Sequence, residues 1–387
     1  MKIADRISRI QPSITLEMTA KAADLRSQGI DVINLSVGEP DFDTPPNIKE
    51  AAFYAINNGI TKYTAGAGTA DLKSSVIKKL KRDNDLDFKQ ENIIVSCGGK
   101  HSLYNACQAL FQKGDEVIIF SPYWVSFPDF VSVTGATPVI VPTIPAKQYE
   151  PDFEILEKSI NKNTKGIIIN SPSNPTGGVW SGEAIKRVLK ISKEKELWTF
   201  SDECYEQLTY DKPFTSIQNY DLDNDRILTF QSCSKTYSMT GWRIGYTAGH
   251  RDVIKAMSKL QSQSTSCPNS IAQYAASEAL SGDQGAVKIM RDKFKKRRDF
   301  IVDELNSIDG VSCESPGGAF YVFPSLEKLI GKKIDSSWDF CFKLLNDCAI
   351  ASVPGRSFGS EPNIRFSYAI STERIKLAIQ RMKNILK

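Results

Sequence analysis

The residues with the clearest chemical potential lie between 231 and 246, in the stretch Q-S-C-S-K-T-Y-S-M-T-G-W-R-I-G-Y. A strand is predicted to end at Ser232, and a loop of small hydroxyl residues then presents Lys235. Most lysines are solvated surface charges. A lysine held among hydroxyl groups near an arginine can instead have a lowered pKa and form a Schiff base with a carbonyl compound. Ser232, Ser234 and Arg243 are residue types that bind phosphate, and arginine can do so with two parallel hydrogen bonds.

A second phosphate site is predicted at residues 96–102, where Gly98 and Gly99 follow a strand and open a helix. This arrangement places free backbone N–H groups and the positive end of a helix at one point. Adjacent glycines often mark no more than a tight turn, so the motif is weak by itself. A Schiff-base lysine together with two phosphate-binding elements favours a phosphorylated carbonyl cofactor, and pyridoxal phosphate fits.

Such a cofactor needs a carboxylate beside its pyridine nitrogen so that the ring can act as an electron sink. Asp202, in S-D-E-C-Y, follows a strand and therefore lies where α/β sheets bind ligands. The alternative is that it caps a helix or forms a turn. Tyr205 could donate to the phenolic oxygen of the cofactor. Asn174, held between Pro172 and Pro175, could be a second donor, although Asn-Pro is also common in plain turns.

The elements that must position these residues alternate between strands and helices. The predicted strands are short β-branched runs without polar alternation, at residues 92–97, 116–122, 166–170, 197–202 and 227–232. Such runs indicate a parallel sheet covered on both faces. The predicted helices span residues 100–112, 182–195, most of 253–280, a basic stretch from about 285, and 372–386. The basic helix is expected to keep its lysines and arginines on a solvated face.

After the basic helix the strands become shorter, at 319–324 and 363–368, and alternate with loops. We therefore predict an α/β protein with a large domain over residues 46–285. A smaller α+β domain would combine residues 1–45 with 286–387.

Composition excludes several classes of protein. His101 and His250 are the two histidines of the 387 residues, too few for a three-histidine zinc site. The 49 basic and 45 acidic residues leave a net charge of +4, too even to indicate a nucleic acid or membrane partner. The eight cysteines include no C-x-x-C pair, and no apolar run approaches the ~20 residues of a membrane span. The first ten residues contain no apolar stretch typical of a signal peptide. We expect a cytoplasmic protein without a metal site.

Eight motifs, taken together in order, resemble those of the fold-type I pyridoxal-phosphate enzymes, in the class I aminotransferase family and its subgroup of bacterial-type aspartate aminotransferases. The resemblance extends from about residue 8 to 386 and implies a mostly parallel, seven-stranded sheet in the large domain. The motifs are V-G-E-P-D-F-D-T-P (37–45), K-Y-T-A-G-A-G (62–68), G-G-K (98–100), S-P-Y-W-V (121–125), N-S-P-S-N-P-T-G (170–177), S-D-E-C-Y (201–205), S-K-T-Y-S-M-T-G-W-R-I-G (234–245) and N-I-R-F-S-Y-A (363–369).

The resemblance implies a role for each candidate. Lys235 would form the Schiff base with pyridoxal 5'-phosphate and then move the substrate proton. Asp202 would pair with the pyridine nitrogen, and Tyr205 and Asn174 would bond the phenolic oxygen. Trp124 would stack on the ring. The phosphate would be held by Gly99, Lys100, Ser232, Ser234 and Arg243.

The resemblance also implies how substrate and a second subunit take part. Gly38 and Arg365 would bind the substrate α-carboxylate, beside Trp124 and Asn174. Tyr63 would reach the phosphate in the neighbouring subunit, so a homodimer with shared active sites is expected. The animal-type enzymes bind the second carboxylate of a dicarboxylate with an arginine. No such arginine is identified here, since the region after Lys259 contains none.

In the subgroup that the sequence resembles, a lysine after Gly-Gly binds the second carboxylate, and Lys100 fits this position. Thr15 matches a threonine that assists in members that also accept prephenate. The alternative for Lys100 is a solvated residue at a helix start, and His101 beside it has no assigned role. We therefore expect transamination of L-aspartate with 2-oxoglutarate to oxaloacetate and L-glutamate, with prephenate as a further candidate substrate. The alternatives are an aromatic or alanine aminotransferase, a β C–S lyase, or a non-catalytic pyridoxal-phosphate sensor.

Overall fold

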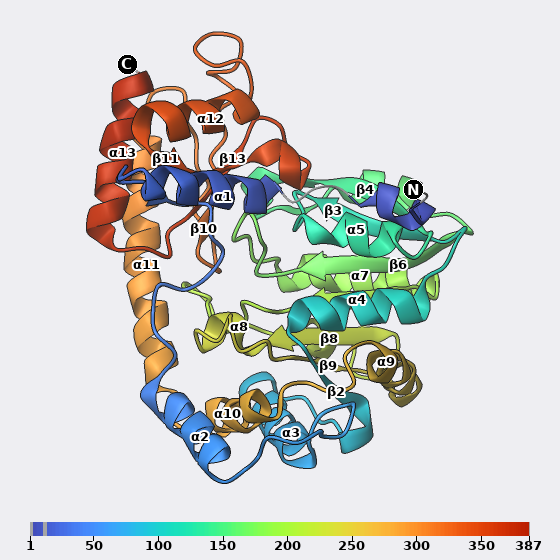
Figure 1. Ribbon diagram of the computed structural model, residues 1–387. Helices are drawn as coiled ribbons and strands as arrows, with labels where there is room; N and C mark the ends of the chain where they lie inside the picture. Colours follow the sequence, from blue (N-terminus) through green and yellow to red (C-terminus); the bar gives the residue numbers. More distant parts are fainter. Residues whose placement is uncertain (1–2, 11–13, 387) are drawn as a thin grey trace.

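The computed structural model describes residues 3–10 and 14–386, apart from the side chains of Thr15 and Leu16. Its centre is an eight-stranded sheet in the order β2-β9-β8-β7-β6-β3-β4-β5 (Figure 1). The strands are β2 (Ile93–Ser96), β3 (Glu116–Ser121), β4 (Thr137–Ile144), β5 (Glu150–Pro151), β6 (Thr164–Asn170), β7 (Trp198–Asp202), β8 (Ile227–Ser232) and β9 (Gly245–Ala248).

The sheet is mainly parallel, as predicted, and its central strands are buried along almost their whole length. Strand β9 runs antiparallel to β2 and β8, and β5 antiparallel to β4. The prediction of seven strands is wrong by one. The additional strand, β5, has two residues and pairs only with the end of β4. A pair such as Glu150–Pro151 carries no β-branched residue and no alternation, so no hydrophobic pattern reveals it.

Helices cover both faces of this sheet. On one face lie α4 (Gly99–Leu110), α5 (Ser126–Ser132) and α9 (Arg251–Ser264). On the other lie α6 (Phe153–Ser159) and α7 (Gly182–Glu194). The β2–β9 end is covered by α2 (Pro46–Asn57), α3 (Ala70–Asn84) and α10 (Ser270–Ser281). Each helix buries one apolar stripe and leaves its polar side outside, which is why these segments are amphipathic in sequence.

The beginning and the end of the chain share a separate apolar core. Strand β1 (Ile33–Asn34) pairs in parallel with β11 (Ile350–Ala351), and Met18 packs in the same core as Val302 and Ile379. A second small sheet has the order β10-β13-β12. The elements of this region are α1 (Ile14–Ser27), β10 (Tyr321–Val322), α12 (Ser337–Cys348), β12 (Val353–Pro354), β13 (Ile364–Ser367) and α13 (Thr372–Leu386).

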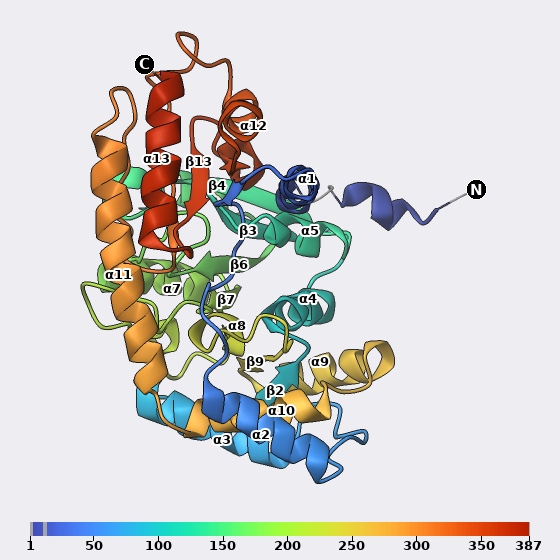
Figure 2. The same cartoon turned by 60° about the vertical axis from the view of Figure 1, so that its left-hand side comes forward.

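Helix α11 (Gly285–Asn306) runs along one side of the molecule, from the helices beneath the sheet to the terminal region (Figures 1 and 2). Its apolar face is buried as predicted, but the expected solvation of its arginines is wrong. Arg298 is 3% exposed and its guanidinium pairs with Asp211 at 2.6 Å. Arg297 is also buried and pairs with Asp41 at 2.7 Å. Both guanidinium groups pair with aspartates that are distant in the sequence. The pattern of the helix alone therefore does not predict their burial.

A network of buried charged and amide groups lies under the ends of β7 and β8. Lys79, on α3, is 1% exposed, and its ammonium donates to Asn84 (2.8 Å), to Gln231 (2.7 Å) and to the carboxylate of Glu206. The Gln231 amide in turn donates to Glu206 (3.1 Å) and to Glu203 (3.2 Å). Burial raises the pKa of the Glu203 carboxyl, which favours its neutral form. The Lys79 ammonium therefore mainly compensates the charge of Glu206.

Substitution of Lys79 by methionine is expected to lower the free energy of unfolding by about 3–5 kcal/mol, because Glu206 would remain buried without its counter-charge. Urea unfolding measures the change. Lys78→Met, which removes an exposed lysine of the same helix, is the matched control. The double variant Lys79→Met/Glu206→Gln should recover part of the loss. Equal losses in Lys78→Met and Lys79→Met would contradict the assignment.

Candidate active site

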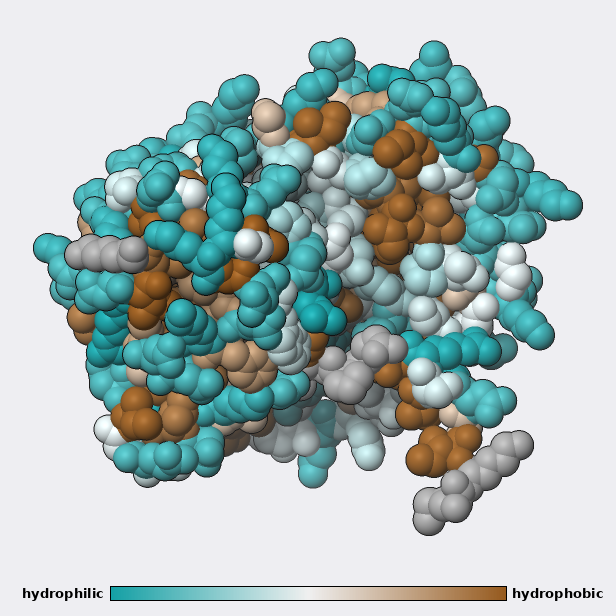
Figure 3. Space-filling model, turned by 90° about the horizontal axis from the view of Figure 1, so that it is seen from above, coloured by the Kyte–Doolittle hydropathy of each residue, from teal (hydrophilic) through white to brown (hydrophobic). Residues whose placement is uncertain are grey.

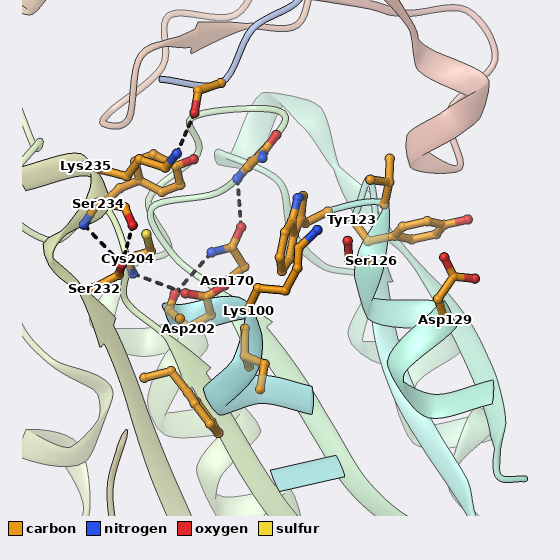
Figure 4. Close-up of a pocket in the computed structure, with 18 of the residues that line it drawn as sticks. Lys100, Tyr123, Ser126, Asp129, Asn170, Asp202, Cys204, Ser232, Ser234 and Lys235 are labelled. Carbon is orange, nitrogen blue, oxygen red and sulfur yellow. Dashed lines mark hydrogen bonds between the residues drawn. The ribbon is translucent and has the colours of Figure 1, made fainter. Parts of the chain in front are cut away.

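A cavity of about 890 Å³ lies at the carboxyl ends of the central strands, between the sheet and the terminal region (Figure 4). Mostly hydrophilic side chains form the face of the molecule seen from above, with apolar ones in smaller patches (Figure 3). Twelve of the predicted site residues line the cavity, although they come from distant parts of the chain. They are Gly38, Gly99, Lys100, Trp124, Asn174, Asp202, Tyr205, Ser232, Ser234, Lys235, Arg243 and Arg365.

Lys235 lies on a short helix, α8 (Cys233–Thr236), where the sequence had predicted a loop. Ser232 begins this helix, and its hydroxyl accepts a hydrogen bond from the backbone N–H of Ser234. The Lys235 ammonium donates to the backbone carbonyl of Gly38, which belongs to the N-terminal segment (Figure 4). Burial lowers the pKa of Lys235, as do the positive charges of Arg243 and Arg365, although Cys204 and Glu39 oppose the shift. A neutral amine, the form that reacts with carbonyl groups, is therefore favoured.

Asp202 ends β7 and is 6% exposed. Its carboxylate accepts a hydrogen bond from the backbone N–H of Cys204 at 3.2 Å. Burial raises the pKa of Asp202 to about 7, although the Cys204 hydrogen bond and the positive charge of Lys235 oppose the shift. A buried carboxyl group in this state is suited to pair with a cationic group brought into the cavity.

The predicted anion site is formed by the start of α4 and the loop before β9. Gly98 has a φ of +91°, and a Cβ atom built there would lie 2.3 Å from Nη2 of Arg243. The Arg243 guanidinium donates to the backbone carbonyls of Thr240 (2.8 Å) and Cys97 (3.5 Å). The positive φ at position 98 favours glycine, and the absence of a side chain there lets this guanidinium lie beside the first N–H groups of α4.

The serine hydroxyls complete this part of the cavity. Ser232 and Ser234 lie at the end of β8, and their Oγ atoms are 2.9 Å apart. Figure 4 shows both beside Asp202 and Lys235, opposite Tyr123 and Asp129. A Cβ atom built at Gly99 would lie 3.4 Å from that of Ser232, so the two segments predicted to bind phosphate lie side by side at the cavity.

Arg365, on β13, is 3% exposed. Its guanidinium donates to Oδ1 of Asn174 at 2.9 Å and to the carbonyl of Ser36 at 2.6 Å. It lies over the rings of Tyr321 (4.7 Å) and Phe358 (5.0 Å). Among the described residues, its buried Nε has no hydrogen-bond partner. An oriented, buried guanidinium with an unused donor is suited to bind a carboxylate.

Tyr205 is buried, and its hydroxyl lies 2.9 Å from that of Tyr321. Burial holds the pKa of Tyr205 well above its ordinary value, so the hydroxyl stays protonated and can donate. A Cβ atom at Gly38 would lie 2.6 Å from the Tyr321 hydroxyl, which explains why a glycine stands there. Tyr321 was not predicted as a site residue, because an aromatic residue in a short apolar strand resembles ordinary core.

Lys100 lines the cavity from the first turn of α4, with its ammonium 5.0 Å from the centre of the Trp124 ring. Partial burial of the Lys100 ammonium and the positive charge of Arg243 lower its pKa, whereas the negative charge of Asp129 raises it. His101 beside it has a structural contact: its Nδ1 accepts from the backbone N–H of Cys97 at 3.3 Å.

Two predicted residues are not placed in the cavity. Tyr63 is 90% exposed on the surface, away from the cavity of its own chain. Thr15 belongs to α1, but its side chain lies outside the described part of the structure.

Asn170 and Arg356 are among the lining residues that the sequence did not predict. Asn170 accepts from the backbone N–H of Asn174 at 2.7 Å and donates to the carbonyl of Asp202, which joins two predicted site segments. Its position at the end of a strand was a usable signal. Arg356 comes from the loop P-G-R-S-F-G, where no pattern points to a site.

A parallel α/β sheet whose strand ends gather a buried lysine, a carboxyl group and an anion site is typical of enzymes that hold a phosphorylated cofactor. The family model of aminotransferase class I and II matches residues 30–382. The chain is 44% identical over 390 residues to the probable aspartate/prephenate aminotransferase of Rhizobium leguminosarum bv. phaseoli, with 98% of each chain covered.

It is also 44% identical over 392 residues to the aspartate aminotransferase of Bacillus subtilis, covering 100% of this chain and 99% of that one. The solved aspartate aminotransferase of Thermus thermophilus with maleate superposes with a TM-score of 0.95, at 38% identity and complete coverage of both chains. The chain belongs to the aminotransferase class I and II family and is an aminotransferase. The family, the fold class and the enzyme class predicted from the motifs are confirmed.

The described residues form no cluster of histidine, cysteine or acidic side chains that could hold a metal ion. None of the helices in the described part of the chain is long and apolar enough to cross a membrane.

The raised pKa of Asp202 predicts a pH-dependent stability of the cofactor-free protein. A carboxyl group with a raised folded-state pKa contributes stability below its ordinary pKa of 3.8, which is lost as the pH rises towards about 7. Relative to Asp202→Asn, the free energy of unfolding of the unmodified protein should therefore fall by about 2 kcal/mol between pH 5 and pH 8. Urea unfolding at several pH values measures this difference, with Asp223→Asn as the exposed control. A difference that stays constant with pH would contradict the assignment.

Proposed function

We propose that the protein uses pyridoxal 5'-phosphate to transfer the amino group of L-aspartate to 2-oxoglutarate. The observation that carries this proposal is the buried guanidinium of Arg365 in the same cavity as the buried amine of Lys235 and the carboxyl group of Asp202. These groups suit the α-carboxylate, the amino group and the cofactor ring of such a reaction. The names of the Rhizobium, Bacillus and Thermus relatives support aspartate as the donor, and the first also supports prephenate as a further substrate.

The cavity fits this cofactor. The guanidinium of Arg243 packed on Gly98 is suited to the phosphate, and the buried carboxyl of Asp202 to the pyridine nitrogen. The chemistry supplied by bound pyridoxal phosphate is a carbonyl group that condenses with amines and a ring that accepts electrons. Tyr205 and the amide NH₂ of Asn174 would donate to the phenolic oxygen, and Trp124 would cover the ring. The phosphate would be held by Gly99, Lys100 through its backbone, Ser232, Ser234 and Arg243.

Lys235 would hold and move the proton at the substrate Cα. Its lowered pKa favours the neutral amine, which can accept a proton, and the carbonyl of Gly38 holds its nitrogen in place. Asp202 would stay ionised beside a cationic ring nitrogen, since an opposite charge lowers a carboxyl pKa.

Arg365 would bind the substrate α-carboxylate, with Gly38 beside it. We propose that residues 46–285 form one domain and that residues 1–45 and 286–387 form the second. Arg365 belongs to the second, while its partner Asn174 belongs to the first. Substrate binding at this arginine would then favour closure of the cavity and exclude water.

Lys100 would interact with the distal carboxylate of the substrate, with Thr15 assisting. Its position at the start of α4, on the far side of the cavity from Lys235, supports this role (Figure 4). An aromatic or alanine aminotransferase and a β C–S lyase are the alternatives on the same fold.

A homodimer is proposed because the surface near Tyr63 carries exposed apolar side chains. Phe53, Tyr54 and Ile56 on α2 are each at least half exposed, and the Tyr54 ring stacks on that of Tyr274 at 5.5 Å. Exposed aromatic groups of this kind mark protein interfaces. Tyr63 would then reach the phosphate bound in the neighbouring subunit.

We also propose a cytoplasmic location. All eight cysteines are free thiols. Proteins of reducing compartments commonly keep their cysteines in this state.

The donor preference is tested with steady-state kinetics over aspartate, alanine, phenylalanine and arogenate, with 2-oxoglutarate as acceptor. Aspartate is expected to give the highest kcat/KM, and Lys235→Ala should lose at least about 10³-fold in kcat because no other group would move the Cα proton. Lys100→Ala should reduce kcat/KM for aspartate more than for alanine. Release of a thiol, ammonia and pyruvate from an added S-alkylcysteine, without transamination, would instead support the lyase.

The shared site is tested with Tyr63→Phe. The loss of a hydroxyl that binds phosphate is expected to raise the dissociation constant of pyridoxal phosphate about 10-fold, while sedimentation still shows a dimer. Tyr54→Phe is the matched control, since Tyr54 lies on the same face but has no proposed contact with the cofactor. A monomeric protein, or an unchanged dissociation constant in Tyr63→Phe, would contradict the proposal.

A further inference from the structure

Arg356 is a basic residue of the cavity to which neither the motifs nor the proposed mechanism gives a role. It lies on η5 (Gly355–Phe358), a short 3₁₀ turn between β12 and β13. The cavity is lined by five basic side chains and three acidic ones. The basic residues are Lys100, Lys235, Arg243, Arg356 and Arg365, and the acidic ones are Glu17, Asp129 and Asp202.

Three of the basic groups are assigned under the proposed function to the amine, the phosphate and the α-carboxylate, and Lys100 is assigned to the distal carboxylate. Lys235 takes the reacting amine, Arg243 the phosphate and Arg365 the α-carboxylate. Lys100 and Arg356 are therefore the basic groups of the cavity that can meet a second acidic group of the substrate. Of these two, Lys100 is partly compensated, because the negative charge of Asp129 acts on it.

Arg356 has no such compensation. In the part of the chain that the structure describes, its guanidinium makes no hydrogen bond and no ion pair. It lies over the Trp338 ring of α12, 5.4 Å from the ring centre. Glu17, another charged residue at the cavity, is 3.2 Å from Lys21 and is therefore already paired. An arginine on an aromatic ring keeps all five of its N–H donors available for a ligand.

The backbone holds Arg356 next to the segment that carries Trp124. The N–H of Tyr123 donates to the carbonyl of Phe358 at 3.0 Å, and the Ser121 hydroxyl donates to the carbonyl of Gly359 at 2.8 Å. Gly359 has a φ of +80°, and a Cβ atom there would lie 2.7 Å from the Tyr123 ring. The turn is thereby closely joined to the wall of the cavity that contains Trp124, over which the Lys100 ammonium lies.

We propose that Arg356 is a specificity-determining residue that binds the distal carboxylate of dicarboxylate substrates, together with Lys100. It supplies, from the same chain, the second-carboxylate arginine that the sequence motifs did not reveal. A guanidinium can hold a carboxylate by two parallel hydrogen bonds, whereas the lysine supplies a point charge. This inference rests on the proposed function, since it specifies how that site selects its substrate.

The test compares Arg356→Gln, Arg356→Lys and Lys100→Gln with the unmodified holoenzyme. Arg251→Gln is the control, because it removes an exposed arginine of α9 outside the cavity. The first readout is kcat/KM for aspartate and for alanine, which lacks the distal carboxylate. The second is calorimetric binding of maleate, a dicarboxylate without an amino group, and of propionate, a monocarboxylate.

Arg356→Gln is expected to lower kcat/KM for aspartate about 10- to 100-fold, the effect of one charged hydrogen-bonded contact, and to change that for alanine less than about 3-fold. Maleate affinity should fall by a similar factor and propionate affinity should not. Arg356→Lys should retain an intermediate selectivity, and Arg251→Gln should behave as the unmodified protein.

Equal losses for aspartate and alanine, or unchanged maleate affinity in Arg356→Gln, would overturn the inference while leaving the aminotransferase proposal intact. An unmodified enzyme that prefers alanine or phenylalanine to aspartate would contradict the proposed substrate instead. In that case the maleate measurement still tests whether Arg356 binds a carboxylate, because maleate binding does not depend on which amino donor is transaminated. Thermal unfolding of each variant separates loss of binding from loss of fold.

Discussion

The buried ammonium of Lys79 joins the turn after β7 to the end of β8, and the position of the groups that line the cavity depends on it. Its partners Glu206 and Gln231 stand directly beside Tyr205 and Ser232 in the chain, as Glu203 stands beside Asp202. Asp202, Tyr205 and Ser232 line the cavity, and Gln231 both lines it and belongs to the network. A displacement of the network would be passed directly to the groups that line the cavity.

Burial determines which protonation state is favoured for the titratable side chains of the cavity. Burial lowers the pKa of Lys235 and raises that of Asp202, so each is shifted toward its neutral form before any ligand arrives. Burial also lowers the pKa of Arg365, whose charge is supported by two aromatic rings and two oxygen acceptors. Charged ligands that enter such a cavity meet groups that are already oriented, and little reorganisation is needed.

The sequence predicted those elements whose formation depends on residues that are close together in the chain. Buried β-branched runs located five strands of the central sheet, and amphipathic runs located its main helices. The glycine pair at the start of α4 and the motif around Lys235 predict an anion site, because each needs particular residue types at fixed spacing, and the structure places both segments at the cavity. Features created by long-range contacts were not predictable in this way. Strand β5 exists only as a partner for β4, and the burial of Arg298 depends on Asp211, 87 positions away. Arg356 reaches the cavity through a turn held by the backbone of another segment.

The pairing of β1 with β11 has a consequence for how the protein is made. A ribosome releases the N-terminal residues first, yet the strand that pairs with β1 lies more than 300 positions later in the chain. The central sheet has its strands and covering helices between α2 and α10, so it can assemble while synthesis continues. The segment that carries Gly38 has to wait until the last strands and α13 emerge. A chain that ends before β11 would lack both Arg365 and the strand that pairs with β1, so we expect it to be inactive.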